Sequence, residues 1–217
     1  MTASRNVLVL GASGLIGRFL TDDLRSRSFQ VTGLAREFTL AQRTSPLDLE
    51  LPIMAMDRAA LAQLLGDQDV DVVVNCLGVL QDGPGSDTAA VHREFVHRLL
   101  EAINASGRAI RLIHISIPGS AKDDLTDFSR TKREAEQIIA ASGLRYAILR
   151  PGFVIAPAAF GGSAMVRALA ALPVEMPAAD SSVSSPSSVS GIDAAAVWSR
   201  VATATSSSTM GISWNLT

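Results

Sequence analysis

Three glycines spaced three positions apart, Gly11, Gly14 and Gly17, follow a run of four apolar residues that begins at Val7. An amphipathic pattern typical of a helix continues from them without a break. The first N–H groups of a helix have no partner within it and carry a partial positive charge, so a pyrophosphate binds there when no side chain blocks it. In this interpretation Gly11 permits the turn, Gly14 the approach of the ligand, and Gly17 the packing of helix on strand.

The segment GASGLIG has one residue more before its second glycine than the G-x-G-x-x-G form of dinucleotide-binding loops. A tight turn that binds nothing is the alternative interpretation. The order of strand, glycines and helix favours nucleotide binding, and Ser13, Leu15 and Ile16 complete the predicted cofactor-binding loop.

Short apolar runs alternate with helical patterns as far as residue 150. Several runs are apolar at successive positions, which is typical of parallel strands covered on both faces. The alternation predicts an α/β fold, a Rossmann-like doubly wound parallel sheet. The predicted strands are 6–10, 30–35, 52–56, 71–76, 110–116 and 145–150, and the predicted helices are 15–27, 58–65, 88–106 and 129–142.

The pattern changes after Pro151. We expect a helix over 161–172, a serine-rich loop at about 180–190, a last helix over 193–204 and a short strand in GISWNL. This part is too small for an independent domain. The sequence therefore predicts one dinucleotide-binding domain over 1–217, to which 151–217 contributes a small cap.

The composition is that of a folded chain, because 47% of its 217 residues are hydrophobic and 18% are charged. The net charge of −2 lacks the basic surplus of a nucleic-acid partner. The single cysteine, Cys76, excludes an intrachain disulfide and is interpreted as a core thiol in a reducing cytoplasm. No signal peptide is expected, and the longest uncharged stretch, between Arg150 and Arg167, is too short to span a bilayer. We expect a soluble cytoplasmic protein with a small-molecule substrate; its oligomeric state stays open.

The end of the second predicted strand bears on the identity of the dinucleotide. An acidic residue there binds the ribose 2′-hydroxyl of NAD, whereas an arginine accepts the 2′-phosphate of NADP. The strand ends at Arg36, which favours NADP, and the adjacent Glu37 keeps NAD open. Arg18, directly after the last glycine, is either a second phosphate contact or a solvated helix residue.

Five segments occur in the order found in atypical and extended short-chain dehydrogenases/reductases: GASGLIG, VVNCLGVLQDGP, LIHISIPGS, FSRTKREAE and LRPGFVIAP. Residues 6–170 resemble the NAD(P)H-binding proteins of this superfamily that are similar to the 39 kDa subunit of respiratory complex I and to nucleoside-diphosphate-sugar epimerases. The resemblance implies a Rossmann fold and an NAD(P) cofactor, and it is not specific to one reaction.

The resemblance also implies roles for residues that follow the predicted strands or begin the late helices. Those expected at the adenine and its ribose are Asp57, Arg58, Asn75, Cys76, Leu77 and Gly78. Those expected at the nicotinamide end are Ser116, Lys132, Pro151, Gly152 and Phe153. Ser116 and Lys132 are the catalytic candidates. Asp193 resembles the acidic residue that caps a late helix.

Some of these residues also have an alternative, purely structural interpretation. Asn75 and Ser116 are also suited to satisfying a strand end. Lys132 also fits a solvated helix surface, with Glu136 four residues later as its partner. The place of Lys132 in the series of motifs favours the functional role.

The sequence departs from the superfamily at its acid. These reductases use Tyr-x-x-x-Lys, in which the phenol donates a proton and the lysine lowers its pKa. Here Phe128 occupies the tyrosine position, and the single tyrosine, Tyr146, lies in a predicted strand. His92 and His97 are expected on a surface helix, and His114 in the core. Clustered metal ligands are not evident, so no metal is expected.

Three functions remain open at this point. The first is an NADP-dependent oxidoreductase that lacks the usual tyrosine and whose substrate, such as a flavin or quinone, takes hydride without a protein proton donor. The second is a dinucleotide-binding redox sensor or assembly factor without turnover. The third, a sugar-nucleotide epimerase or dehydratase, is disfavoured by Phe128 and by the short C-terminal part.

Overall fold

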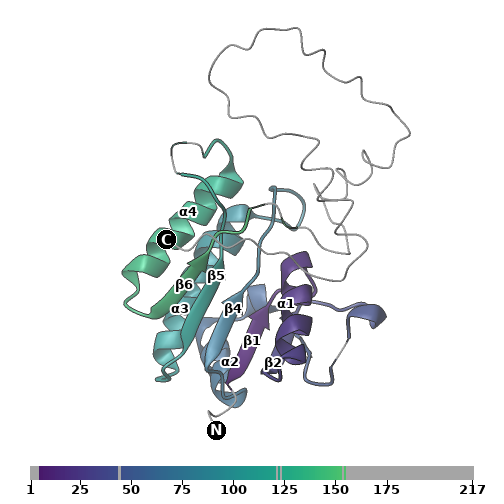
Figure 1. The fold of residues 1–217 in the computed structure, drawn as a ribbon. Coiled ribbons are helices and arrows are strands. Elements are labelled where there is room, and N and C mark those ends of the chain that lie inside the picture. The colour runs from purple at the N-terminus through teal and green to yellow at the C-terminus, as the bar shows by residue number, and fades with distance from the viewer. Residues whose placement is uncertain (1–4, 44, 121, 123, 153, 155–217) are drawn as a thin grey trace, which may run out of the picture. The chain divides into compact units, whose positions relative to one another are not determined.

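The computed structural model describes residues 5–43, 45–120, 122, 124–152 and 154. In this part of the chain six parallel strands form one sheet in the order β3-β2-β1-β4-β5-β6 (Figure 1). The strands are β1 (Asn6–Leu10), β2 (Gln30–Ala35), β3 (Leu49–Glu50), β4 (Val72–Asn75), β5 (Arg111–Ile115) and β6 (Arg145–Leu149). The α-helices are α1 (Leu15–Ser26), α2 (Arg58–Asp67), α3 (Phe95–Ala105) and α4 (Asp127–Ala141). The described residues also contain the 3₁₀ turns η1 (Leu40–Gln42) and η2 (Ile53–Ala55) and the π-helical turn η3 (Ala90–Glu94).

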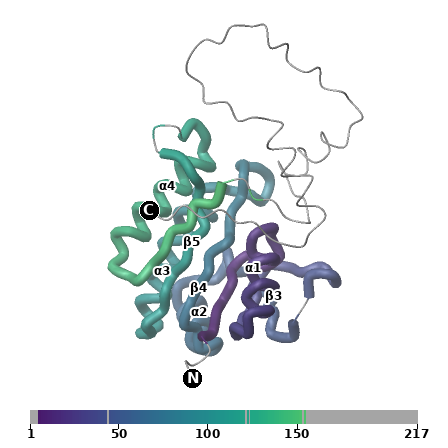
Figure 2. Tube along the Cα trace, in the orientation of Figure 1, coloured from purple at the N-terminus to yellow at the C-terminus, as the bar shows by residue number. Residues whose placement is uncertain are grey.

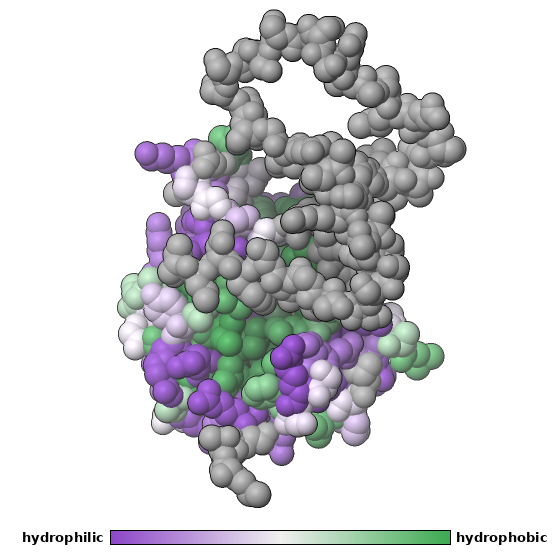
Figure 3. All heavy atoms as spheres, in the orientation of Figure 1, coloured by the Kyte–Doolittle hydropathy of each residue, from purple (hydrophilic) through white to green (hydrophobic). Residues whose placement is uncertain are grey.

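Helices cover both faces of the sheet, which explains the unbroken apolar runs of its central strands. Leu8 and Leu10 of β1 share a buried cluster with side chains of α2, α3 and α4. Val7 and Val9 point the other way, into a cluster that includes Leu20 of α1. Figure 1 accordingly shows α1 in front of the sheet and α2 and α3 behind it. The predicted doubly wound α/β fold is therefore confirmed. On the face viewed in Figure 3, apolar side chains gather over the middle of the sheet.

The strand order places one end of the sheet at a topological switch point. The chain runs outward from β1 to β2 and β3, then crosses to β4 on the other side of β1. Because all strands are parallel, the segments that follow them meet at one edge, as the chain trace in Figure 2 shows. In open α/β sheets ligands bind at this carboxyl edge, next to the switch point.

The predicted strand 52–56 is wrong. The third strand of the chain, β3, is instead Leu49–Glu50, and Ile53 to Ala55 form η2. Pro52 has no N–H to contribute to a strand ladder, so pairing with β2 ends when Leu51 N–H donates to Ala35 O at 3.0 Å. The charged Asp48 and Glu50 interrupted the apolar pattern of the true strand and concealed it.

The four helices predicted before residue 151 are confirmed, with changes at their ends. Thr126 caps α4, since its hydroxyl accepts the N–H of Ser129, and the helix therefore begins at Asp127. The pattern over 88–106 becomes two elements, η3 and α3. The predicted helices 161–172 and 193–204, the serine-rich loop, the terminal strand and most of the predicted cap lie outside the described residues. Among the residues that are described, no helix is both long and apolar enough to cross a membrane.

Candidate functional site

The glycine loop is fixed at the carboxyl edge by the neighbouring strand. Gly11 has a φ of 79°, in the left-handed region that glycine favours. Its N–H and that of Ala12 both donate to Leu34 O, at 2.8 and 3.0 Å, and Gly14 N–H donates back to Gly11 O at 3.0 Å. The loop therefore turns directly from β1 into α1, as the sequence predicts.

The three glycines differ in what a side chain would meet. A Cβ at Gly17 would lie 2.2 Å from Gly11 O, and one at Gly11 would lie 3.2 Å from the Cys76 backbone. A Cβ at Gly14 would meet only Gly11 O, at 3.2 Å, and Gly14 is exposed. Packing within the protein thus explains why Gly11 and Gly17 cannot carry a side chain. It gives little reason for a glycine at position 14. Gly14 is also the N-cap of α1 and provides no side-chain cap. This open, uncapped helix start fits a pyrophosphate.

The residues after β2 lie beside this loop. Arg36 and Glu37 are exposed, whereas Phe38 is buried and its N–H donates to Glu50 Oε1 at 2.7 Å. Gln42 of η1 reaches back to the glycine loop and donates to Ser13 O at 2.9 Å. Arg36 thus belongs to a short structured connection at the carboxyl edge, as an adenosine-end contact requires.

Three further candidates of the adenosine end, Arg18, Asp57 and Arg58, have different surroundings. Arg18 lines a small cavity with Phe38 and Gln42, and its Nε is buried, so it is not simply a solvated helix residue. Asp57 is the N-cap of α2 and accepts the N–H of Ala60 at 2.8 Å. Asp57 and the adjacent Arg58 are both exposed at the carboxyl edge. Their predicted adenine contacts remain predictions.

The side-chain amide of Asn75, which is buried, holds the segment that follows β4. Asn75 Oδ1 accepts the N–H of Leu77 at 3.1 Å, and its Nδ2 lies 3.2 Å from His114 Nδ1. Cys76 packs against the smaller core cluster, on the α1 face. Burial raises the pKa of the Cys76 thiol to about 12, although the positive charge of Lys132 opposes this. Cys76 is thus a partly buried thiol at the margin of the core.

Lys132 is buried at the same edge rather than solvated. Its Nζ donates to Ile115 O at 3.0 Å and to Leu77 O at 3.2 Å, so it joins the ends of β5 and β4. Burial lowers the pKa of Lys132 to about 8, and Cys76 and Glu136 oppose that change. A Cβ on the exposed Gly78 would lie 3.5 Å from Nζ. An ammonium has three donors, and the two carbonyls use two of them.

Phe128 lies one helical turn before Lys132 on α4. Its ring centroid is 5.4 Å from that of His92, with the two rings at 76° in an edge-to-face contact. Ser116 is buried at the end of β5, where its N–H donates to Leu149 O at 2.7 Å. The structure therefore brings both catalytic candidates to one edge, with a phenyl ring in the place predicted for a phenol.

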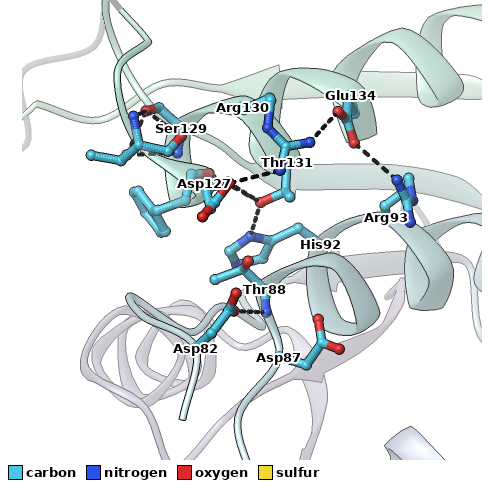
Figure 4. Close-up of polar contacts among 12 residues, drawn as sticks. Asp82, Asp87, Thr88, His92, Arg93, Asp127, Ser129, Arg130, Thr131 and Glu134 are labelled. Carbon is cyan, nitrogen blue, oxygen red and sulfur yellow. Dashed lines mark hydrogen bonds and ion pairs between the residues drawn. The ribbon is translucent and has the colours of Figure 1, made fainter.

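The prediction that His92 lies on the protein surface is wrong. His92 is 1% exposed, because η3 turns it toward α4. Its Nε2 accepts the N–H of Val79 at 3.2 Å, so the ring proton is on Nδ1, which lies 2.9 Å from Thr131 Oγ1 (Figure 4). Burial lowers the pKa of His92 to about 3; the charge of Lys132 acts in the same direction and that of Asp82 opposes it.

His114 is buried, as predicted. The orientation of the Asn75 amide makes His114 Nδ1 an acceptor, so its proton is on Nε2. Burial again lowers the pKa, to about 3, with a contribution from the charge of Lys132. The two buried histidines are therefore neutral and hold opposite tautomers. Neither supplies the acid that Phe128 lacks.

The two histidines predict how stability depends on pH. In the unfolded chain a histidine gains a proton below about 6.5, but in the fold neither ring does so until about 3. The contribution of the two histidines to the free energy of unfolding is therefore constant above about 6.5 and falls toward 3, by up to about 1.4 kcal/mol per pH unit for each histidine. Urea unfolding of the wild type and His114→Gln between pH 8 and 5 checks this. The variant should show about half the slope, and an unchanged slope would contradict the account.

An ion-pair network that the sequence pattern did not reveal holds the loop after β5. Arg133 donates to Ile117 O at 3.1 Å and to Pro118 O at 2.7 Å, and pairs with Glu136 at 3.2 Å. Arg150, at the end of β6, binds both carboxylate oxygens of Glu136, at 2.9 and 2.8 Å. Burial acts to raise the pKa of Glu136, but the hydrogen bonds and charges of these arginines outweigh it and lower the pKa. Spacing in KREAE suggested only a surface pair with Lys132.

Two of the remaining predicted residues, Pro151 and Gly152, follow β6 next to Arg150. Their predicted contacts with the nicotinamide remain predictions. Phe153 and Asp193 lie outside the described residues. Within the described ranges, no three histidine, cysteine, aspartate or glutamate side chains are grouped as a metal site.

Comparison with known proteins agrees with this geometry. A family model described as NAD(P)H-binding matches residues 11–180. The chain is 32% identical over 188 residues to 3-diazoavenalumate denitrifying reductase of Streptomyces sp, covering 73% of this chain and 60% of that protein. It is 32% identical over 162 residues to divinyl chlorophyllide a 8-vinyl-reductase of Cucumis sativus, covering 67% of this chain and 38% of that protein. The chain thus spans less than two thirds of either relative.

Solved structures agree on the fold. UDP-glucose 4-epimerase of Thermus thermophilus, in complex with NAD, superposes with a TM-score of 0.60 at 16% identity, covering 76% of this chain and 61% of that one. The epimerase structure thus supports the Rossmann architecture. The residues that the family model matches begin at Gly11, the first glycine of the loop. The chain belongs to the NAD(P)H-binding family.

Proposed function

We propose that the chain is an NADPH-dependent reductase whose substrate accepts hydride without a proton from a tyrosine phenol. One observation carries the proposal: Lys132 is buried at the carboxyl edge with its ammonium on two carbonyls, while Phe128, one turn away on α4, has no proton to give. A cofactor-binding lysine without its phenol suits hydride transfer and does not suit carbonyl reduction.

Different residues at the carboxyl edge of the sheet suit different parts of the dinucleotide. The open helix start at Gly14 suits the pyrophosphate, and the third donor of Lys132 suits a hydroxyl of the nicotinamide ribose. When bound, the nicotinamide supplies a hydride. With a quinone as acceptor, one hydride and one proton from water give the hydroquinone and NADP⁺, so no protein acid is required.

The names of the two relatives support this class of reaction. One name specifies a vinyl group and the other a diazo compound, and both proteins are called reductases. Neither name specifies a ketone or an aldehyde. Since the chain spans only part of each relative, these names guide the choice of acceptors and do not fix one.

A panel of acceptors tests the proposal. The protein is mixed with NADPH and, in separate reactions, with quinones, flavins, activated alkenes and simple carbonyls, and loss of reduced nicotinamide absorbance is followed. We expect turnover with at least one acceptor of the first three classes and negligible turnover with carbonyls. NADPH binding without turnover on any acceptor would favour the second candidate, a dinucleotide-binding sensor, which the lack of an ionisable acid at Phe128 also supports.

Arg36 is expected to set the preference for NADPH over NADH. A charge-assisted bond to the 2′-phosphate contributes about 1.5–3 kcal/mol. Arg36→Ala should therefore weaken the binding of NADPH by roughly tenfold or more and leave the affinity for NADH nearly unchanged, as measured by calorimetry. Arg27→Ala removes an exposed arginine from the opposite end of α1 and is the matched control. Equal weakening of both cofactors by Arg36→Ala would exclude this role.

A further inference from the structure

The imidazole of His92 connects the two segments that place Lys132. Its Nε2 accepts the N–H of Val79, in the segment after β4, and its Nδ1–H donates to Thr131, in α4 (Figure 4). The hydroxyl of Thr131 donates onward to Asp127 O at 2.7 Å. Both nitrogens of the ring are therefore engaged, one as acceptor and one as donor, in a buried position.

We propose that His92 is a positioning residue for Lys132: its neutral imidazole fixes the segment 77–79 and the α4 turn of Thr131 in one relative arrangement. The inference rests on the proposed function, because that function assigns Lys132 to the cofactor. No role for His92 follows from the sequence pattern, which predicts only a surface helix there.

The contacts of Lys132 show why this arrangement matters. Lys132 Nζ donates to Leu77 O, and His92 accepts from Val79, so two neighbouring side chains hold one short segment. Gly78 lies between them, and a Cβ on it would be 3.5 Å from both His92 Nε2 and Lys132 Nζ. On the helix side, Thr131 directly precedes Lys132. The imidazole thus fixes both the acceptor of the ammonium and the turn that carries it.

The backbone around His92 is itself unusual. It lies in η3, a π-helical turn within a longer helix. Such turns contain one residue more than an α-turn and are frequent at functional sites. Here the turn directs His92 inward, while its neighbour Arg93 pairs with Glu134 at 3.4 Å on the outer side of α4. The extra residue therefore serves to bring the imidazole between α4 and the segment 77–79.

The test compares two substitutions of different hydrogen-bonding capacity. In His92→Gln the amide keeps one acceptor for Val79 and one donor for Thr131, whereas His92→Leu keeps neither. His97→Leu, at an exposed position of α3, is the control for the same substitution. The measurements are the dissociation constant for NADPH and the ¹⁵Nζ signal of Lys132. The chain has only two lysines, Lys122 and Lys132, so this signal is readily assigned.

We expect wild type, His92→Gln and His97→Leu to show a slowly exchanging Lys132 ammonium signal. His92→Leu should lose that signal and bind NADPH about tenfold more weakly, with His92→Gln within about threefold of wild type. If His92→Leu keeps both the signal and the affinity and only melts at a lower temperature, His92 merely packs and the inference is wrong.

Two further outcomes keep the inference testable. If His92→Leu does not fold, Thr131→Val and Thr131→Ser replace the pair, because valine keeps the shape of threonine without its hydroxyl. The serine variant should then keep the Lys132 signal and the valine variant should lose it. If wild type does not bind NADPH, the proposed function fails, whereas the Lys132 signal in the same variants still decides whether His92 positions that lysine.

Discussion

Gly14→Val is expected to abolish NADPH binding while the protein stays folded. The two added methyl groups would occupy the open space at the start of α1, where a pyrophosphate needs direct access to backbone N–H groups. Within the protein a Cβ at Gly14 meets only Gly11 O, at 3.2 Å, and the φ of −75° at this position is ordinary for valine. The free energy of unfolding should therefore change by about 1 kcal/mol or less.

Two other glycines provide the controls for this experiment. Gly66→Val introduces the same side chain at an exposed position of α2, where a Cβ meets nothing within 4 Å, and should leave NADPH affinity unchanged. Gly17→Ala should unfold the protein or destabilise it strongly, because its Cβ would lie 2.2 Å from Gly11 O. Equal NADPH affinity of wild type and Gly14→Val in calorimetry would mean that the dinucleotide binds elsewhere.

Phe128→Tyr is expected to produce carbonyl reduction that wild type lacks. The substitution adds one oxygen to a ring of the same shape, on the helix that carries Lys132. A cation beside a phenol lowers its pKa, and a positioned general acid contributes about 10²–10⁴-fold in rate. The measurement is NADPH oxidation with simple ketones and aldehydes, in wild type and in the variant.

A second substitution separates this explanation from a general change in the site. With NADPH at saturating concentration, Phe128→Tyr combined with Lys132→Met should lose the gain, because the phenol then lacks its cation. The account fails if wild type already reduces carbonyls at ordinary enzymatic rates, with a pH profile that shows one essential acid. The first residue to examine in that case is Ser116, which is buried at the end of β5 beside Glu136.

Most of the fold follows from the sequence because its signals are local. Successive apolar residues in β1 report burial on both faces, and the spacing of Gly11, Gly14 and Gly17 reports a strand that turns directly into a helix. β3 could not be recognised in the same way. Only two residues long, it carries Glu50, whose side chain accepts the Phe38 N–H, so its hydrophobic pattern is weak.

The site was only partly predictable, because burial depends on tertiary packing. The motif SRTKREAE fits a charged helix surface, yet Lys132 is buried since the carbonyls of Leu77 and Ile115, far away in sequence, accept from it. The sequence predicts His92 on a surface helix, but His92 lies in a π-helical turn and is buried. The order of the motifs points to Lys132 as a site residue. The periodicity of the sequence does not reveal that the carbonyls of Leu77 and Ile115 accept from it.

A crystal structure of the wild-type protein with NADPH tests the central claim most directly. The account predicts the pyrophosphate on the N–H groups at the start of α1, next to Gly14. It also predicts the nicotinamide ribose within hydrogen-bonding distance of Lys132 Nζ and the 2′-phosphate beside Arg36. Phe128 should lie at the nicotinamide end, with no ionisable side chain of the described residues in the place of a phenol. A dinucleotide bound away from the Gly11–Gly17 loop, or a ribose that does not contact Lys132, would contradict it.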